Sequence, residues 1–324
     1  MSANDSICVL GLGLIGGSLL RAATAAGRVG FGYNRSPATV DEARAAGFDA
    51  DTDLAAVLSR AAAQDALIVI ATPVTALDAI LDAVVRHAPN CALTDVISVK
   101  AAVAQSVAAH GLSARYVGGH PMAGTADSGW AATDPTLFAG ATWVVGTDDG
   151  VDPLVWLSVS GLADAVGAVV VPVATGDHDR AVAAISHLPH LTAAATAAIG
   201  GGEGALALRL AAGSFRDGTR VAGTAVPLQR AMLEANAPAL LITLSETIDR
   251  LTRARDELRD HGSVQVVVDN GHRARLRYEE MAAAEPEPIV DVEIGAPGWT
   301  GEMRHQAHLG RVWRGAQTRS ASPE

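Results

Sequence analysis

The chain has 324 residues, of which 49% are hydrophobic and 18% are charged, so it can form about two domains with a sizeable core. Its formal net charge of -11 argues against nucleic acid or an acidic membrane as the main partner. The mean hydropathy of +0.24 comes largely from alanine and not from an apolar run of membrane length. The N-terminus carries no export-signal pattern, and Cys8 and Cys91 have no metal or redox spacing, so we expect a cytoplasmic protein with reduced thiols.

Short apolar runs alternate with helical patterns in the first half of the chain. The runs predict strands at Ser6–Leu10, Val29–Tyr33, Ala66–Ile70, Ala92–Asp95 and Thr142–Val145. Helices are predicted between some of them, at Leu14–Ala26, Thr75–His87 and Lys100–Ala109. This alternation is typical of a parallel, doubly wound α/β sheet, which we expect over residues 1–173.

The pattern changes near Val173. Helical periods follow with almost no strand signal, apart from the ambiguous Val264–Val268. The best helices are predicted at Asp177–Leu191, Gly204–Ala212, Val226–Ala235 and Pro238–Arg259. The small side chains of Leu191–Ile199 suggest close packing between helices, such as occurs at a subunit interface. We therefore expect an all-helical domain over residues 174–284 and a loosely ordered tail over residues 285–324.

The strongest local motif is Gly11-Leu-Gly13-Leu-Ile-Gly16, between the first predicted strand and the first predicted helix. In that context Gly11 permits a tight turn, Gly13 lets the backbone approach a pyrophosphate, and Gly16 lets helix and strand pack closely. The helix N-terminus would offer free N–H groups to the phosphates. The motif therefore predicts a dinucleotide site.

The end of the second predicted strand bears on the choice of dinucleotide. A site selective for NAD usually carries Asp or Glu there, bonded to the ribose 2′-hydroxyl. This chain has Asn34, Arg35 and Ser36 instead. Arg35 can pair with a 2′-phosphate, which favours NADP, and Asn34 can still accept from a ribose hydroxyl, so NAD would be tolerated. The alternative is that Arg35 is a solvated loop residue.

Three polar clusters are candidates for the chemistry. Asp95, Ser98 and Lys100 follow a predicted strand, where ligands bind in open parallel sheets, although helix capping and surface charge explain Asp95 and Lys100 equally well. His120 lies in Gly-Gly-His-Pro-Met-Ala-Gly-Thr, which we expect to be a loop. The third cluster comprises His187, His190, Arg216, Asp217 and Arg220. The guanidinium groups suit a carboxylate, and no third ligand is suitably spaced for a metal, so no metal is expected.

In this order, the motifs resemble the prephenate/arogenate dehydrogenase family of tyrosine biosynthesis. The quoted residues are Gly-Leu-Gly-Leu-Ile-Gly-Gly-Ser, Asp-x-x-Ser-Val-Lys, Gly-Gly-His-Pro-Met-Ala-Gly-Thr, Ser-His-Leu-Pro-His and Phe-Arg-Asp-x-Thr-Arg. The resemblance runs from about Ile7 to Leu258. It implies an N-terminal Rossmann domain and a C-terminal all-helical domain that forms a homodimer.

The resemblance also implies an activity: oxidative decarboxylation of prephenate to 4-hydroxyphenylpyruvate with hydride transfer to NADP, or NAD. His120 would accept the hydroxyl proton, with Ser98 hydrogen-bonded to it beside the nicotinamide. Arg220 would hold a substrate carboxylate. The other substrate-binding residues expected are Thr125, His187, Arg216 and Asp217. The cofactor-binding residues expected are Gly11, Gly13, Leu14, Ile15, Gly16, Asn34, Arg35, Ser36, Thr72, Pro73 and Ser98.

Two departures from the family concern specificity. Many relatives have an acidic residue where this chain has Ala126, and many have Trp where it has Gln229. The alternatives are arogenate as substrate, another hydroxyacid dehydrogenase and a non-catalytic nucleotide sensor. The lysine-dependent hydroxyacid dehydrogenases lack the His-Pro loop, and a sensor would not need His120 and Ser98. The tail from Pro286 resembles the start of an ACT regulatory domain but is too short for one, so it is at most a remnant.

Overall fold

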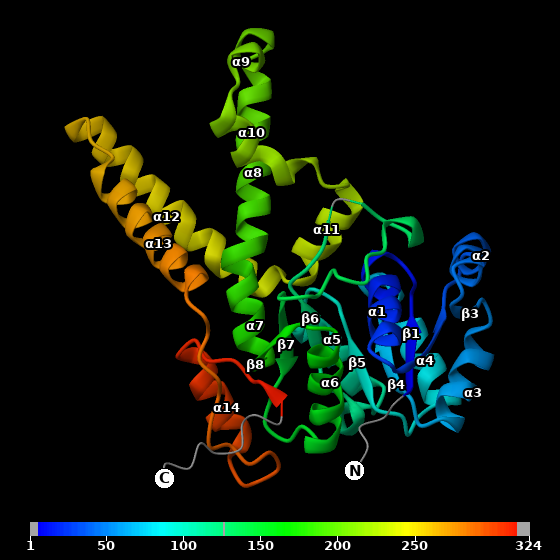
Figure 1. Cartoon of the computed structure of the whole chain (residues 1–324). Helices are drawn as coiled ribbons and strands as arrows, with labels where there is room; N and C mark the ends of the chain where they lie inside the picture. Colours follow the sequence, from blue (N-terminus) through cyan, green and yellow to red (C-terminus); the bar gives the residue numbers. More distant parts are fainter. Residues whose placement is uncertain (1–5, 126, 316–324) are drawn as a thin grey trace. The chain divides into compact units, whose positions relative to one another are not determined.

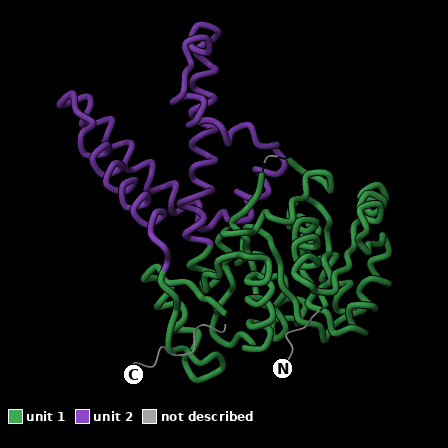
Figure 2. Tube along the Cα trace, in the orientation of Figure 1, with its two compact units in different colours: residues 1–178, 287–324 green, residues 179–286 purple. Residues whose placement is uncertain are grey.

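The structure is a computed structural model and describes residues 6–125 and 127–315. The chain divides into two compact units (Figure 2). Unit 1 contains the residues up to His178 together with those from Glu287 onward, and unit 2 contains Asp179–Pro286. The C-terminal segment thus belongs to the same unit as the N-terminal sheet.

Unit 1 is built on a five-stranded parallel sheet in the order β3-β2-β1-β4-β5 (Figure 1). Its strands are β1 (Ser6–Leu10), β2 (Val29–Tyr33), β3 (Asp49–Asp51), β4 (Leu67–Ile70) and β5 (Leu93–Asp95). The connecting helices are α1 (Leu14–Ala25), α2 (Pro37–Ala45), α3 (Leu54–Ala63), α4 (Leu77–His87), preceded by η1 (Val74–Ala76), and α5 (Ala101–Ala109). The doubly wound sheet expected from the sequence is confirmed; β3, too short to give a signal, was missed.

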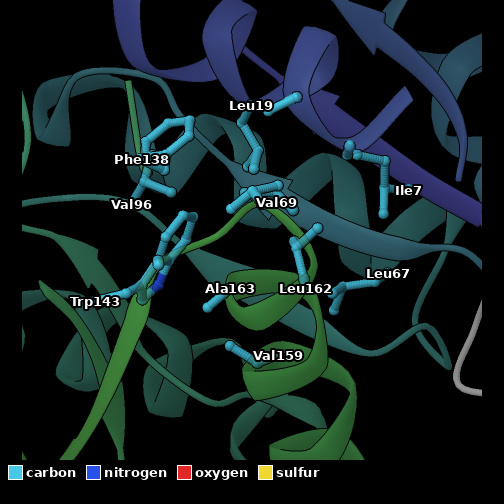
Figure 3. Close-up of a cluster of buried hydrophobic side chains, with 14 of the residues drawn as sticks. Ile7, Leu19, Leu67, Val69, Val96, Phe138, Trp143, Val159, Leu162 and Ala163 are labelled. Atoms are coloured by element: carbon cyan, nitrogen blue, oxygen red, sulfur yellow. The ribbon is translucent and has the colours of Figure 1, made fainter. Parts of the chain in front are cut away.

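The central strands of this sheet, β1 and β4, are buried on both faces. Ile7 and Val9 belong to one apolar cluster and Cys8 and Leu10 to the other, as the alternation of side chains along a strand requires. Figure 3 shows the first cluster, where Leu19 of α1 and Trp143 lie with side chains of the sheet. Burial raises the pKa of the Cys8 thiol, which keeps it protonated and inert. The continuous apolar sequence of these strands is therefore the reason why they could be predicted.

A second sheet has the order β6-β7-β8 and carries the His-Pro motif. Its elements are β6 (Gly119–Pro121), β7 (Thr142–Gly146), α6 (Pro153–Ala165) and β8 (Val169–Val173), with η2 (Ser113–Arg115) and η3 (Trp130–Ala132) in the connections. The expectation of a loop at the motif is wrong, because His120 lies on β6 opposite Val144, in an antiparallel pair. Pro121 is compatible with this strand because β6 is at the edge of the sheet, where one side of the backbone needs no ladder bonds.

The C-terminal segment, residues 287–315, packs tightly in unit 1, so the expectation of a loose tail is wrong for these residues. Ile289 and Met303 are fully buried. The ring of Trp156 in α6 meets Trp299 and Trp313 edge to face, with centroids 5.5 and 5.3 Å apart. Large aromatic contacts of this kind outweigh the Pro- and Gly-rich composition that suggested disorder. The segment forms helix α14 (Trp299–His308) and isolated bridges, and no ACT-like strand forms within residues 287–315.

Unit 2 is all-helical. Its elements are the end of α7 (Thr175–Val182), η4 (Ala183–His187), α8 (Leu188–Gly202), α9 (Ala205–Leu210), α10 (Gly213–Thr219), η5 (Arg220–Gly223), α11 (Val226–Ala235), α12 (Ala237–His261) and α13 (Gln265–Ala283). The ambiguous Val264–Val268 lies at the start of α13 and is helical. The structure describes all of residues 179–286 and places no strand among them.

The continuous helix Thr175–Gly202 corrects the expectation that the chain has no apolar run of membrane length. It has 28 residues and a mean hydropathy of 1.3 over its most apolar window, so by length and composition it could cross a membrane. It also contains η4, a single π-helical turn that ends at His187. Pro189 lies two residues after this turn and has no N–H to donate to it, and its ring crowds the preceding turn, as expected next to a widened helix.

Candidate active site

The glycine loop leaves open space above the N-terminus of α1. Gly11 has a φ of +107°, and a Cβ there would lie 2.7 Å from the carbonyl oxygen of Ala71. A Cβ on Gly16 would overlap the carbonyl oxygen of Gly11. By contrast, a Cβ on Gly13 would have nothing within 4 Å. Two of the glycines are thus required by the packing of the chain itself, and Gly13 leaves the kind of open approach that a pyrophosphate needs.

A second feature of this region fits a bound dinucleotide. Thr72 follows β4 and lies against Gly11, and its hydroxyl oxygen is buried without a hydrogen-bond partner among the described residues. Buried hydroxyl groups are normally paired, so this atom fits a ligand group. Leu14 and Ile15 are half-buried at the start of α1, and Pro73 is exposed beside Thr72. A nucleotide pyrophosphate fits the residues present.

The loop after β2 joins a cation to a helix N-terminus. Arg35 is exposed, while Asn34 and Ser36 are half-buried. The hydroxyl oxygen of Ser36 accepts from the N–H of Thr39 at 3.4 Å and so caps α2, and the side-chain oxygen of Asn34 accepts from the N–H of Ser36 at the same distance. The hydroxyl of Ser36 keeps its own proton to donate. The loop therefore offers an anion the guanidinium of Arg35, a hydroxyl proton and the positive end of α2.

The cluster after β5 is built around a buried ion pair. Asp95 is fully buried, and its carboxylate pairs with the ammonium group of Lys100, which is 2% exposed. Asp95 also accepts from the N–H of Ile97 at 2.8 Å and from the hydroxyl of Tyr116 at 2.6 Å. Surface charge and side-chain capping, the alternatives open from the sequence, are wrong for this pair. Ser98 lies half-buried in the turn that this network shapes.

His120 is half-buried on β6 and is paired with another histidine. Its Nδ1 lies 2.8 Å from Nε2 of His178, and the two rings meet edge to face. Thr125 is exposed further along the chain, where its hydroxyl oxygen accepts from the N–H of Asp127 at 3.2 Å. Ala126 lies outside the described residues. His178 gives His120 a partner at Nδ1 that orients the imidazole, and either ring can be the donor, depending on the tautomers.

In unit 2, a buried network surrounds His187. Its Nδ1 lies 3.0 Å from the side-chain nitrogen of Asn236, which also donates to the carbonyl oxygen of Asp179 at 2.8 Å. Because an amide nitrogen is a donor, Nδ1 of His187 accepts here, and the neutral ring carries its proton on Nε2. Nε2 is thus the nitrogen of His187 that donates.

The arginine cluster of unit 2 is exposed, in contrast to this network. Arg216 and Asp217 form an exposed ion pair at 3.4 Å on α10, and Arg220 is exposed at the start of η5. Burial lowers the pKa of His190 on α8, and the positive charge of Arg220 lowers it further. That effect shows that Arg220 and His190 are close enough to interact, although the histidine is held by Gln229 at 3.4 Å and not by the arginine.

Three residues of these networks were missed by the sequence analysis: His178, Asn236 and, as a buried group, Lys100. His178 and Asp179 stand together at the start of the long helix, and this His-Asp pair was the available signal. Asn236 gave none, because its partners are 49 and 57 residues away. In the described part of the chain, no group of three or more His, Cys, Asp or Glu side chains is arranged to hold a metal ion.

Two family models match the chain. The nucleotide-binding domain of prephenate dehydrogenase matches residues 17–172, and the dimerization domain of the same family matches residues 174–267. The chain belongs to the prephenate dehydrogenase family. The resemblance inferred from the motifs, and the fold class that it implied, are thereby confirmed.

Individual relatives agree with this assignment. The prephenate dehydrogenase of Bacillus subtilis is 32% identical over 264 residues, which cover 78% of this chain and 69% of that protein. A solved structure from Corynebacterium glutamicum, described as a candidate prephenate dehydrogenase, is 48% identical, with a TM-score of 0.91 over 97% of this chain and 99% of that one. The Synechocystis arogenate dehydrogenase is 29% identical, with a TM-score of 0.73 over 84% of this chain and 99% of that one.

Proposed function

We propose that this chain is an NAD(P)-dependent dehydrogenase that converts prephenate to 4-hydroxyphenylpyruvate and CO₂ in tyrosine biosynthesis. The observation that carries the proposal is the His120–His178 pair, on an edge strand of a unit that matches the nucleotide-binding domain of this family. The second candidate substrate is arogenate, which the Synechocystis relative is named for.

The chemistry assigned to His120 is removal of the proton from the ring 4-hydroxyl. For this the Nδ1–H of His120 would donate to Nε2 of His178, and Nε2 of His120 would accept the proton. Hydride leaves C4 at the same time, and the ring carboxylate then leaves as CO₂. The electrons of the broken bond between the ring and the carboxylate complete the aromatic ring. The ring oxygen then takes up a proton to give the phenol. The nicotinamide of the bound cofactor supplies the hydride acceptor.

The remaining residues bind and orient. Gly11, Gly13, Gly16 and Thr72 would hold the pyrophosphate end of the dinucleotide, and Ser98 would lie beside the nicotinamide. Arg220 would hold a substrate carboxylate, with His187 donating through Nε2. Arg216, Asp217 and Thr125 are assigned to substrate binding on the family resemblance. Arg35 and Ser36 support a preference for NADP over NAD.

We propose that unit 2 forms a homodimer. Residues 174–267 match a dimerization domain, and unit 2 exposes many large apolar side chains in the single chain. Examples that are more than half exposed are Ile199, Leu206, Leu210, Leu228 and Leu241. A second copy of the chain that covers these side chains would bury this exposed apolar surface and exclude water from it. The same need accounts for the apolar helix Thr175–Gly202 in a cytoplasmic enzyme, which is the location we propose.

The test is a nicotinamide-reduction assay with four combinations: prephenate or arogenate, each with NAD or NADP. The expected result is the highest kcat/KM with prephenate and NADP. Higher kcat/KM with arogenate would select the second candidate and retain the mechanism. No reduction in any combination, with cofactor binding intact, would overturn the proposal.

A further inference from the structure

The Asp95–Lys100 pair reaches both segments that carry the candidate catalytic groups. The ammonium group of Lys100 donates to the carbonyl oxygen of Gly119 at 2.7 Å, and Gly119 directly precedes His120. The carboxylate of Asp95 accepts from the N–H of Ile97, which directly precedes Ser98. One buried pair therefore anchors the backbone on the N-terminal side of His120 and of Ser98.

The glycines before His120 have no room for a side chain against this pair. A Cβ on Gly119 would lie 2.6 Å from the carbonyl oxygen of Asp95. A Cβ on Gly118 would lie 2.9 Å from the hydroxyl oxygen of Tyr116, the third member of the network. Since backbone and buried side chains enclose both glycines, the start of β6 is fixed against the end of β5 by contact as well as by hydrogen bonds.

We propose that Lys100 is a positioning residue for His120: its hydrogen bond to the Gly119 carbonyl sets the direction in which the imidazole leaves β6. The proposal rests on the proposed function, in which His120 takes a proton from the substrate. A strand of three residues at a sheet edge determines its own direction poorly, and the buried ammonium group supplies the missing constraint. Displacement of a catalytic group by about 1 Å can cost about 10²-fold in rate.

The alternative role of the pair is stability alone. Buried ion pairs contribute little net stability compared with apolar residues of similar volume, because both charges must leave water. A purely structural pair would affect unfolding but not the imidazole of His120. The test must therefore read the state of His120 as well as stability, because Asp95→Asn leaves the buried ammonium group of Lys100 without its carboxylate and is itself expected to be less stable than wild type.

The comparison that isolates the hydrogen bond is Asp95→Asn against Asp95→Asn/Lys100→Met. Both variants lack the carboxylate, and they differ in the donor to the Gly119 carbonyl. We expect the double variant to have a kcat about 10- to 100-fold below that of the single variant, by the same misplacement argument. The dissociation constant for NADP should agree within about twofold, since the glycine loop is untouched.

Arg304→Met is the matched control. Arg304 also donates to a main-chain carbonyl, that of Thr147 at 2.7 Å just after β7, and also pairs with a carboxylate, that of Asp149 at 2.9 Å. This variant should lower the melting temperature while kcat stays within about twofold of wild type. It therefore measures how the loss of a cation–carbonyl hydrogen bond in unit 1 changes the melting temperature and kcat when β6 is not moved.

A readout that needs no turnover separates this proposal from the proposed function. The Cε1–H resonance of His120, identified by its loss in His120→Asn, should shift between the single and double variants and stay in place in Arg304→Met. If the wild type oxidises neither prephenate nor arogenate, the proposed function fails, and the resonance still decides the positioning role. An unchanged resonance and equal kcat in the single and double variants, both folded, would overturn the role of Lys100.

Discussion

His120 in unit 1 and Arg220 in unit 2 are each proposed to take part in the reaction, but the chain holds them in opposite ways. His120 is paired with His178 through Nδ1, and the residue before it is enclosed by buried groups. Arg220 is exposed, and the neighbouring Arg216 makes an exposed ion pair with Asp217. The proposed proton acceptor is thus oriented in the chain itself, whereas the proposed substrate-binding arginines are solvated.

This difference predicts how substitutions in the two units divide between turnover and binding. A group oriented in advance contributes mainly to the transition state, so its loss lowers kcat. A solvated cation that gains its partner only with the substrate contributes to binding in the ground state as well, so its loss raises KM. The predictions below test this division, beginning with the largest expected effect.

Replacing His120 by Asn should lower kcat by about 10²- to 10⁴-fold, the usual contribution of a positioned general base. Asn keeps a polar side chain of moderate size but accepts no proton near neutral pH. NADP binding, measured by calorimetry, should remain within about twofold of wild type. Turnover close to that of wild type would remove His120 from the mechanism and, with it, the contrast between the units.

Two alanine substitutions in the glycine loop should separate folding from cofactor binding. Gly16→Ala would force a methyl group onto the backbone of Gly11, so it should lower the unfolding free energy by about 1–3 kcal/mol or more. Gly13→Ala has free space around it in the chain itself, so the melting temperature should not change. It should weaken NADP binding by about tenfold or more, or 1.4 kcal/mol, because the methyl group meets the pyrophosphate. Equal melting temperatures and equal affinities in both variants would contradict the division of roles among the glycines.

Arg220→Ala should mainly raise KM for prephenate. A carboxylate that loses a charge-assisted partner loses about 1.5–3 kcal/mol, which corresponds to about 10- to 150-fold in KM. Arg216→Ala is the matched control from the same exposed cluster and should change KM less. If Arg216→Ala raises KM while Arg220→Ala does not, the carboxylate-binding role passes to Arg216.

Arg35→Ala should reduce the preference for NADP over NAD by about 1–3 kcal/mol, because the 2′-phosphate loses its guanidinium partner. The measurement is kcat/KM for both cofactors. Arg44→Ala, an exposed arginine of α2 that pairs with Asp51 at 3.3 Å, is the control and should leave the ratio unchanged. A wild type that uses NAD with the higher kcat/KM, or an equal loss for both cofactors in Arg35→Ala, would contradict our interpretation of the loop.

The contrast between residues held by buried neighbours and exposed residues also bears on which parts of the molecule could be predicted from the sequence. Strands β1, β2, β4 and β5 of the main sheet were predicted within one residue, since β1 and β4, which are buried on both faces, are continuously apolar and the glycine loop follows β1. Strand β3, which has three residues, was missed. The strand at His120 was missed, because a strand of three residues that begins with Gly and ends with Pro has no propensity signal. The ordered C-terminal segment was missed for a different reason. Its order depends on Trp156, more than 140 residues from Trp299 in sequence, and composition within the segment cannot report such a contact.

The candidate site also has residues that the sequence predicted and residues that it did not. The types of residue in the motifs were enough to nominate His120, Ser98 and Arg220. The groups that hold them were not predictable, because His178 is 58 residues from His120 and no local pattern links them. The burial of Lys100 was ambiguous for a related reason: a lysine after a strand is usually solvated, and the carbonyl of Gly119 and the carboxylate of Asp95, which make its burial tolerable, cannot be recognised from the local pattern.

The smallest expected effect concerns the electrostatic interaction between Arg220 and His190. Burial and then the charge of Arg220 hold the pKa of His190 below 6.5, so Arg220→Ala should raise that pKa by removing the second cause. Because the unfolded chain binds this proton more readily than the folded chain, His190 makes the unfolding free energy fall as pH falls through 6.5 toward the folded pKa. That dependence should weaken in Arg220→Ala. An NMR titration of the His190 Cε1–H resonance, identified with His190→Gln, measures the pKa directly, and Arg216→Ala serves as the control. The difference between wild type and Arg220→Ala should shrink at high salt, as screening of an exposed charge requires. A pKa of His190 that falls in Arg220→Ala, or that rises equally in Arg216→Ala, would show that Arg220 is not the cation that His190 senses.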